Sequence, residues 1–396
     1  MSSLPALFDS ETRTVAGLMS GTSLDGVDAV IARLSGSGPA MSIEQLAFAH
    51  QPYSAELQNL LLQNSDEAAS SVRDLTLLGT RLADLYAEAV RSALDTIHLD
   101  PSDLDLIGMH GQTVHHVPDP ADCAGAEVRG TLQVGNASVL ANRLGVPVVG
   151  DFRSADMALG GQGAPLVPYF DYVHFTDPQE TRGVLNLGGI ANLTVLPAGG
   201  EPSAVAAFDT GPGNMVIDAL ARRLFQRSYD ADGALAAEGT RDHAWLADLL
   251  DDPYFAAPPP KSTGRERFGT DYAERLVDEG RARGCSAHDL MATGTALTAY
   301  SVYQAYARFV RDTAALDVVI ASGGGIYNRT LMELLADAFS PIPVRTADAY
   351  GLDPDAKEAL CFAVLAHETA NGVPTNLPSV TGADRPTLLG SISWPG

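Results

Sequence analysis

TVAGLMSGTSLDGVDAVIA, residues 14–32, joins two apolar segments through a glycine-rich loop. Both segments have the length of a strand and end at turn residues, so they predict a β-hairpin with an enlarged tip, MSGTSLDG. A related pattern occurs at residues 204–208, an apolar run that leads into DTGPGN and then into an apolar stretch with helical spacing, residues 215–225. Two related domains that face one cleft would produce such a repeat.

Short apolar runs and longer stretches with helical spacing alternate along the rest of the chain. Strands are expected at residues 104–109, 146–149, 183–187 and 318–321, and helices at residues 68–97, 288–313 and 355–370. This alternation predicts an α/β fold. The length of 396 residues favours two domains, because one domain usually has roughly 100 to 200 residues. We expect an N-terminal domain of residues 1–155 completed by residues 380–396, and a C-terminal domain of residues 156–379.

The chain carries 25 Lys and Arg residues against 49 Asp and Glu residues, which gives a formal net charge of -24. Nucleic acids and anionic membranes bind cationic surfaces, so neither is an expected partner. Only two of the basic residues are lysines, Lys261 and Lys357. A bound phosphate would therefore have to be met mainly by backbone N–H groups, arginine, hydroxyls and a cation.

The cysteines Cys123, Cys285 and Cys361 are far apart and form no C-x-x-C pair. The N-terminal segment MSSLPALFDSETR has acidic residues and no apolar run of signal-peptide length. These features predict a reduced, cytoplasmic protein without a disulfide framework.

The loop SGTSLDGVD, residues 20–28, has the composition of a phosphate site. Its glycines let the backbone approach a ligand closely, its hydroxyls can donate hydrogen bonds, and Asp25 and Asp28 could hold hydrated Mg²⁺. An ordinary hairpin turn capped by Asp and Ser would have the same composition. A P-loop is excluded because no G-x-x-x-x-G-K-[ST] occurs, and a Rossmann site is not expected because G-x-G-x-x-G is incomplete.

Two later glycine turns follow apolar strands. In AFDTGPGN, residues 207–214, the turn amides suit an oxyanion or a phosphate, and Asp209 is a candidate general base, directly or through a metal-bound water. The alternative is that Asp209 only caps the turn. In ASGGGIYN, residues 321–328, three consecutive glycines indicate that a flat ligand or another backbone approaches closely, unless the segment is a flexible connection.

Further polar residues are candidates for ligand binding. HGQT contains His110, and DFRSAD contains Asp151, which could accept sugar hydroxyls, and Arg153, which could bind a carboxylate. A local pair between Asp151 and Arg153 would explain the same residues. KSTGRERF, residues 261–268, would face an anionic ligand or form salt bridges with the acidic surface. Glu358 would either favour the dipole of the helix expected there or hold Mg²⁺ through water.

The residues alone are best explained by an ATP-dependent phosphotransferase of two α/β domains without a P-loop. The sequence also resembles the anhydro-N-acetylmuramic acid kinase family. The resemblance rests on segments that run in order along nearly the whole chain: GLMSGTSLDGVDAV at 17–30, HGQT at 110–113, DFRSADMALGGQGAPLVP at 151–168, LNLGGIANL at 185–193, FDTGPGNM at 208–215, PKSTGRERF at 260–268, SGGG at 322–325 and LPSVTGA at 377–383.

The resemblance implies an actin-like (RNase H-like) fold, in which two domains of mixed sheet and helices flank a nucleotide cleft. It also implies ATP and Mg²⁺ as cofactors and a small sugar as the substrate. The implied contacts are as follows: a first phosphate loop of Gly21, Thr22, Ser23, Leu24, Asp25, Gly26, Val27 and Asp28; a second with Gly211 and Gly213; an adenosine turn of Gly323, Gly324 and Gly325; metal ligands Asp25 and Glu358; and sugar contacts from His110, Asp151 and Arg153.

The reaction that the resemblance implies couples ring opening to phosphorylation. Water opens the 1,6-anhydro ring of anhydro-N-acetylmuramate while O6 takes the γ-phosphoryl group of ATP, which gives N-acetylmuramate 6-phosphate and recycles cell-wall sugar. Asp209 matches the catalytic aspartate of the family and would activate the water.

Two alternatives remain from the sequence. An ordinary sugar kinase of the same fold would use Asp209 to deprotonate a free hydroxyl, and a non-enzymatic protein of this fold would change conformation with ATP. The sequence does not decide the oligomeric state, for which a homodimer is one option.

Overall fold

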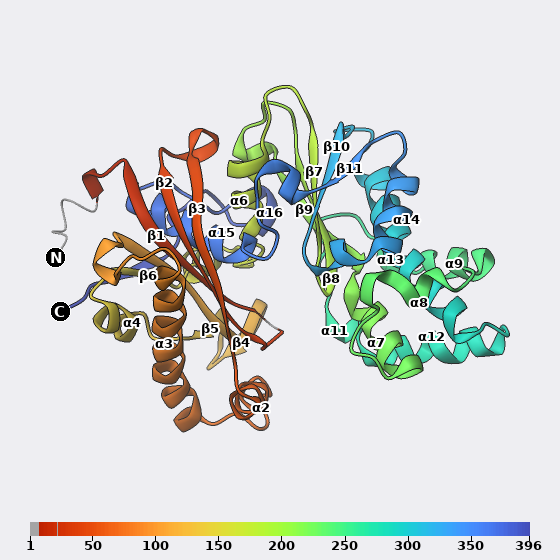
Figure 1. Ribbon diagram of the computed structural model, residues 1–396, viewed down its shortest axis with the longest axis horizontal. Coiled ribbons are helices and arrows are strands. Elements are labelled where there is room, and N and C mark those ends of the chain that lie inside the picture. Colours follow the sequence, from red (N-terminus) through yellow and green to blue (C-terminus); the bar gives the residue numbers. More distant parts are fainter. Residues whose placement is uncertain (1–7, 22) are drawn as a thin grey trace. The chain divides into compact units, whose positions relative to one another are not determined.

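The computed structural model describes residues 8–21 and 23–396, which form two compact units (Figure 1). Unit 1 extends to His174 and resumes at Ala356–Gly396, and unit 2 comprises Phe175–Asp355. These limits differ from the expected boundaries at 155 and 380. The chain just after residue 155 stays with unit 1 because the buried Asp156 carboxylate accepts hydrogen bonds from Asn376 Nδ2 at 2.8 Å and Thr381 Oγ1 at 2.6 Å.

Unit 1 is built on a mixed sheet, whose strands are β1 (Thr12–Ser20), β2 (Gly26–Ser35), β3 (Ser42–Pro52), β4 (Leu106–Cys123), β5 (Ala126–Val134), β6 (Val148–Gly150) and β12 (Ser391–Ser393). The strand order is β12-β6-β4-β1-β2-β3, with β5 paired to β4. Neighbours among β1, β2 and β3 are antiparallel, whereas β1 and β6 each run parallel to β4. Its helices are α2 (Ala55–Asn64), α3 (Val72–Asp95), α4 (Ala137–Leu144), α5 (Ser154–Ala158), α6 (Val167–Phe175, which ends at the unit boundary), α15 (Lys357–Ala370) and α16 (Pro378–Thr381).

Unit 2 is built on a second mixed sheet, whose strands are β7 (Arg182–Leu187), β8 (Ile190–Leu196), β9 (Ala206–Pro212), β10 (Val318–Ser322) and β11 (Val344–Thr346). The strand order is β11-β10-β7-β8-β9. The helices of this unit are α7 (Asn214–Phe225), α8 (Ala234–Ala237), α9 (His243–Leu250), α10 (Pro253–Ala256), α11 (Arg265–Phe268), α12 (Thr270–Ala282), α13 (Ala287–Phe309) and α14 (Arg329–Phe339).

The two sheets repeat one topology. In unit 2, neighbours among β7, β8 and β9 are antiparallel, and β7 and β11 each run parallel to β10, so these five strands match β1, β2, β3, β4 and β6 in order and direction. This arrangement is the actin-like (RNase H-like) topology, which confirms the expected α/β fold. The counterpart of the hairpin β1–β2 is β7–β8, however, and not the 204–225 segment in which the sequence showed its repeat.

Helix α15 lies directly on the sheet of unit 1. A Cβ atom on Gly17 would lie 2.0 Å from the carbonyl oxygen of Ala359, and one on Gly108 would lie 2.0 Å from that of Phe362. Glycine is therefore required at both positions, because only a residue without a side chain lets a helix backbone come so close. The opposite face of the same strands forms a core with α3.

Two predictions about helices are confirmed by the structure. Asn328 is the N-cap of α14, and its side-chain oxygen accepts a hydrogen bond from the backbone of Leu331 at 2.9 Å. The helix expected at residues 355–370 is α15, and Glu358 lies in its first turn.

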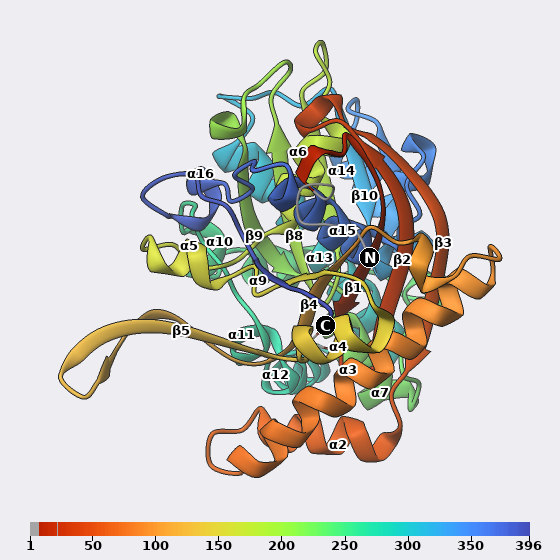
Figure 2. The same ribbon diagram turned by 90° about the vertical axis from the view of Figure 1, so that its left-hand side faces the viewer.

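Beyond the sheet of unit 1, β4 and β5 continue as a two-stranded arm that leaves the body of that unit (Figure 2). Residues 119–130 of this arm are all exposed. Among the helices that the structure describes, none combines the length and the apolar character needed to cross a membrane.

Candidate active site

The tip of the first hairpin is tied to the HGQT segment by buried side chains. Ser20 Oγ lies 2.5 Å from Gln112 Oε1 and 2.6 Å from Tyr53 Oη. The amide of Gln112 also donates a hydrogen bond to the carbonyl of Gly21 at 2.9 Å. Both ends of one buried glutamine thus fix the start of the loop that we expect to bind phosphate. Thr22, the next predicted contact, lies outside the described residues.

The two aspartates of this loop are held by neighbouring side chains. Asp25 Oδ1 accepts a hydrogen bond from Ser23 Oγ at 2.6 Å. Asp28 Oδ1 lies 2.7 Å from Nδ1 of His50 on β3. Ordered carboxylates at the tip of a glycine-containing loop provide the hard oxygen ligands that Mg²⁺ prefers.

The pKa of Glu358 is affected by the same two aspartates, Asp25 and Asp28. Its side chain is exposed at the first turn of α15, yet reduced hydration by the surrounding protein raises the pKa of its carboxyl. Lys357 lowers this pKa, while the carboxylates of Asp28 and Asp25 raise it. Acids that repel one another favour a bound cation. Within the described part of the chain, no group of three His, Cys, Asp or Glu side chains is placed to hold a metal ion.

His110 and Arg153, both predicted sugar contacts, bind each other. Arg153 donates to Nε2 of His110 from Nε at 3.0 Å and from Nη2 at 2.7 Å, and its Nη1 donates to the carbonyl of Gly163 at 2.7 Å. Burial, together with the adjacent guanidinium, holds the pKa of His110 well below its usual value. The imidazole is therefore neutral, and because Nε2 is the acceptor, Nδ1 carries the proton. Nδ1 is buried and has no partner among the described residues.

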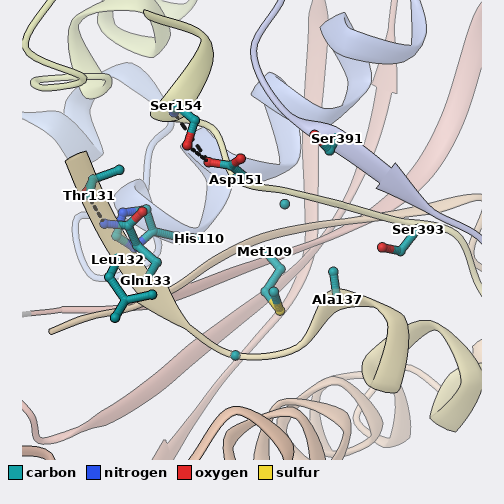
Figure 3. Close-up of a pocket in the computed structure, with 12 residues that line it drawn as sticks. Met109, His110, Thr131, Leu132, Gln133, Ala137, Asp151, Ser154, Ser391 and Ser393 are labelled. Atoms are coloured by element: carbon teal, nitrogen blue, oxygen red, sulfur yellow. Dashed lines mark hydrogen bonds between the residues drawn. The ribbon is translucent and has the colours of Figure 1, made fainter. Parts of the chain in front are cut away.

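Asp151 does not pair with Arg153 in the described structure, as the local alternative required. It lies at a positive φ of 57° and its Oδ1 accepts hydrogen bonds from the hydroxyl (2.6 Å) and the backbone N–H (3.3 Å) of Ser154, where α5 begins. Asp151 and His110 line one pocket of about 360 Å³ in unit 1, which Figure 3 shows. The other lining residues are Met109, Thr131, Leu132, Gln133, Gly135, Ala137, Gly150, Ser154, Ser391 and Ser393.

Three glycine turns meet at one end of the sheet in unit 2. They are residues 187–189 where β7 turns into β8, residues 211–214 at the end of β9, and residues 323–325 after β10. The backbone N–H of Asn214 donates to the carbonyl of Gly188 at 2.8 Å, and the side-chain amide of Asn214 donates to that of Leu187 at 2.9 Å. The turns surround the carboxyl ends of the parallel strands β7 and β10, which is where open α/β sheets bind ligands.

Several of the predicted glycines in these turns are required by close contacts. A Cβ atom on Gly213 would lie 2.3 Å from the carbonyl oxygen of Gly188, and one on Gly325 would lie 2.6 Å from Cβ of Leu187. Gly211 (φ 153°) and Gly323 (φ 82°) have backbone angles that favour glycine, whereas a Cβ on Gly324 would make only an ordinary contact. The triple glycine thus packs against the neighbouring turn and begins a 3₁₀ turn, Gly324–Tyr327.

Asp209 lies within β9, two residues before Gly211. Its Oδ2 accepts a hydrogen bond from the backbone N–H of Thr263 at 2.9 Å. Its own backbone N–H donates to the carbonyl of Lys261 at 3.1 Å, and its carbonyl accepts from the hydroxyl of Tyr254 at 3.0 Å. Burial raises the pKa of Asp209 to about 6, against a lowering contribution from the Thr263 N–H. The carboxylate is thus oriented by the Thr263 N–H and poised to accept a proton near neutral pH.

Sequence reasoning missed three contributors to this site. The role of Gln112 was hidden because a glutamine next to a candidate histidine gives no signal of its own. Gly188 and Gly189 occupy in unit 2 the place that the predicted loop at residues 20–28 occupies in unit 1, and they could have been found by aligning the two hairpins. Thr263 acts through its backbone, which no side-chain pattern reveals.

The repeated topology, with glycine turns at strand ends and oriented carboxylates, defines an α/β protein of the actin-like class, to which sugar kinases belong. The sequence profile of the family described as anhydro-N-acetylmuramic acid kinase matches residues 13–395. The chain therefore belongs to the anhydro-N-acetylmuramic acid kinase family, and it is a phosphotransferase.

Individual members of this family align with the chain over nearly its full length. The anhydro-N-acetylmuramic acid kinase of Salinibacter ruber (strain DSM 13855 / M31) is 61% identical over 396 residues, which is 100% of each chain. The one of Caldanaerobacter subterraneus subsp. tengcongensis is 43% identical over 395 residues, 99% of this chain and 100% of the relative. Among solved structures, a ligand-bound xylulose kinase from Lactobacillus acidophilus aligns with 97% of this chain and 94% of its own at 12% identity and a TM-score of 0.47.

Proposed function

We propose that this kinase uses ATP to phosphorylate O6 of anhydro-N-acetylmuramic acid while water opens the 1,6-anhydro ring. The products are N-acetylmuramate 6-phosphate and ADP, a reaction that returns cell-wall sugar to metabolism. The observation that carries this proposal is the Asp209 carboxylate, which is oriented by Thr263 and has a pKa raised to about 6. An acid of this kind can be ionised at neutral pH and still accept a proton.

In this reaction Asp209 takes a proton from water and not from a sugar hydroxyl. The anhydro sugar has no free hydroxyl at O6, because O6 is bonded to C1. As water bonds to C1, its proton passes to the Asp209 carboxylate, and the C1–O6 bond breaks with its electron pair on O6. That oxygen then bonds to the γ-phosphorus of ATP, and ADP leaves with the electron pair of the broken P–O bond.

Unit 1 is proposed to hold the sugar and the cation. The neutral His110 offers its Nδ1–H, which has no partner among the described residues, and Asp151 offers a carboxylate at the same pocket. Arg153, fixed by His110 and Gly163, supplies positive charge for the lactyl carboxylate. Asp25 and Glu358 fit a Mg²⁺ ion because their carboxylates repel each other in its absence. When bound, Mg²⁺ would stabilise the charge on the transferring phosphoryl group.

The glycine turns are proposed to bind the nucleotide. The loop of residues 21–28 in unit 1 would contact phosphate through backbone N–H groups at its tip. The turn with Gly211 and Gly213 in unit 2 would lie against phosphate by close backbone approach, since the Gly213 N–H already donates to the carbonyl of Gly189 at 2.9 Å. Gly323, Gly324 and Gly325 would pack against adenosine. A chain with two lysines in 396 residues needs such backbone donors for a polyanion.

Turnover in ¹⁸O-water tests the proposal. The enzyme is given ATP, Mg²⁺ and the anhydro sugar, and the product is analysed for the position of the label. We expect ¹⁸O in the C1 hydroxyl and none in the phosphate. Unlabelled N-acetylmuramate 6-phosphate incubated in the same water measures spontaneous exchange at C1. Label in the phosphate, or no label at C1 above this exchange, would contradict the mechanism, and phosphorylation of only free hydroxyl sugars would indicate an ordinary sugar kinase.

A further inference from the structure

The segment Lys261–Thr263 lies beside Asp209 of β9. Two hydrogen bonds connect them, one between backbone groups from the Asp209 N–H to the Lys261 carbonyl and one from the Thr263 backbone N–H to the side-chain Oδ2 of Asp209. From the sequence, this segment could either face an anionic ligand or form salt bridges with the acidic surface. Such a bridge exists farther along, between Arg267 and Asp252, but Lys261 is placed differently.

The Lys261 ammonium group is directed into an aromatic site beside Asp209. Its Nζ donates to the carbonyl of Tyr254 at 3.1 Å and lies 4.6 Å from the centre of the Tyr254 ring and 5.0 Å from that of Phe309. Tyr254 in turn donates its hydroxyl to the backbone carbonyl of Asp209. One tyrosine therefore connects the cation to the aspartate strand. Cation–π contacts of this kind hold an ammonium group in place without neutralising its charge.

We propose that Lys261 is a positioning residue for the kinase reaction, because its backbone holds Asp209 in place and its ammonium charge keeps that carboxylate ionised to act as the base. This inference rests on the proposed role of Asp209. It gives one of the two lysines of the chain a function that does not depend on contact with phosphate.

The charged groups around Asp209 act in opposite directions. The Lys261 ammonium lowers the pKa of Asp209, whereas Glu266 on α11 raises it. The pKa of Lys261 itself is lowered to about 8 by burial and by Arg308 on α13, so Lys261 is cationic at neutral pH. Tyr254 remains neutral because burial and Asp209 raise its pKa further. Replacing Lys261 should therefore raise the pKa of Asp209, and replacing Glu266 should lower it.

The test compares the pH dependence of kcat/KM for the sugar, at saturating Mg-ATP, in the wild type and in Lys261→Met, Lys261→Arg and Glu266→Gln. We expect the acid limb, the pH below which kcat/KM falls, to move to higher pH by a fraction of a unit in Lys261→Met and to stay near its wild-type position in Lys261→Arg. In Glu266→Gln, where an exposed acid is replaced, the limb should move downward. A residue that only packs would lower kcat at every pH without moving the limb.

The outcomes separate this inference from the proposed function. An unmoved limb in folded Lys261→Met, or an equal loss in Lys261→Arg, would overturn the positioning role. If Lys261→Met does not fold, Lys261→Gln takes its place as the uncharged variant, and an unmoved limb in folded Lys261→Gln would overturn the role of Lys261. Asp209→Asn is assayed beside these variants. Wild-type turnover in Asp209→Asn would refute the role of Asp209 as the base. If Asp209→Asn is inactive but the limb does not move in the Lys261 variants, only the role of Lys261 is refuted.

Discussion

The backbone N–H of Thr263 donates a hydrogen bond to Oδ2 of Asp209 at 2.9 Å, and no described residue donates to Oδ1. One oxygen of the carboxylate thus fixes its orientation, and the other is available to accept a proton. The donor is a backbone group, so its position is set by the path of the chain from Lys261 to Thr263.

The pH dependence of turnover should report the pKa of Asp209. Since burial raises this pKa to about 6, the base is protonated, and inactive, below that pH. We expect kcat/KM to fall about tenfold for each pH unit below the limb. Steady-state assays from pH 5 to 8, with circular dichroism to confirm that the protein stays folded, measure this. A limb near pH 4, the usual value for an aspartate, would show that burial does not perturb the base.

Asp209→Asn should stabilise the protein while it abolishes turnover. A pKa raised in the folded state means that folding favours the protonated form, so the unfolding free energy falls as the pH rises from about 4 to about 6 and stays lower above that. The neutral amide removes this cost. We expect a gain of up to about 3 kcal/mol at pH 7.5 and almost none at pH 4 in urea denaturation. A loss of stability at pH 7.5 would contradict the prediction.

Gly108→Ala should displace helix α15 and, with it, Glu358. The added Cβ would lie 2.0 Å from the carbonyl oxygen of Phe362, a distance that the helix cannot accommodate without moving. We expect a loss of about 2 kcal/mol or more in unfolding free energy, together with weaker Mg²⁺ activation measured by titration.

The matched control is Gly79→Ala in the long helix α3. A Cβ atom at Gly79 meets no atom within 4 Å, and its helical backbone suits alanine. This variant should gain about 0.5 to 1 kcal/mol. Equal effects of the two substitutions would show that the glycine on the strand is not required for helix packing.

Lys357 is expected to contribute to stability rather than to proton transfer. Its Nζ lies 2.7 Å from Asp171 Oδ1, and the two side chains are 4% and 3% exposed. Lys357→Met would remove the cation that lies beside a buried carboxylate, so we expect a loss of about 3 to 5 kcal/mol in unfolding free energy. The double variant Lys357→Met with Asp171→Leu should recover much of it, because no charge then remains. A single variant within 1 kcal/mol of the wild type would show that the pair is dispensable.

Several of the strands and helices followed from the sequence because their signals are local. The apolar runs at 183–187 and 318–321 became β7 and β10, and Asn328 caps α14 as expected. The unit boundaries did not follow, because α15 joins unit 1 through contacts with Gly17 and Gly108 that are far away in the sequence.

The site was predicted in part for the same reason. Asp209 was recognisable from its glycine turn, but the support from Thr263 and the aromatic site of Lys261 depend on a distant loop that folds back along β9. The pairing of His110 with Arg153 also required the structure, because the sequence equally allowed a pair between Arg153 and Asp151.

The turnover number of Asp209→Asn, measured beside Asp218→Asn and with ATP affinity determined by titration, tests the central claim most directly. Asp218 on α7 also has its pKa raised to about 6 by burial, so it controls for the loss of a partly buried acid. We expect Asp209→Asn to lose at least about 10³-fold in kcat with nearly unchanged ATP affinity, while Asp218→Asn keeps most of its activity. If Asp209→Asn retained most of its kcat, Asp209 could not be the base.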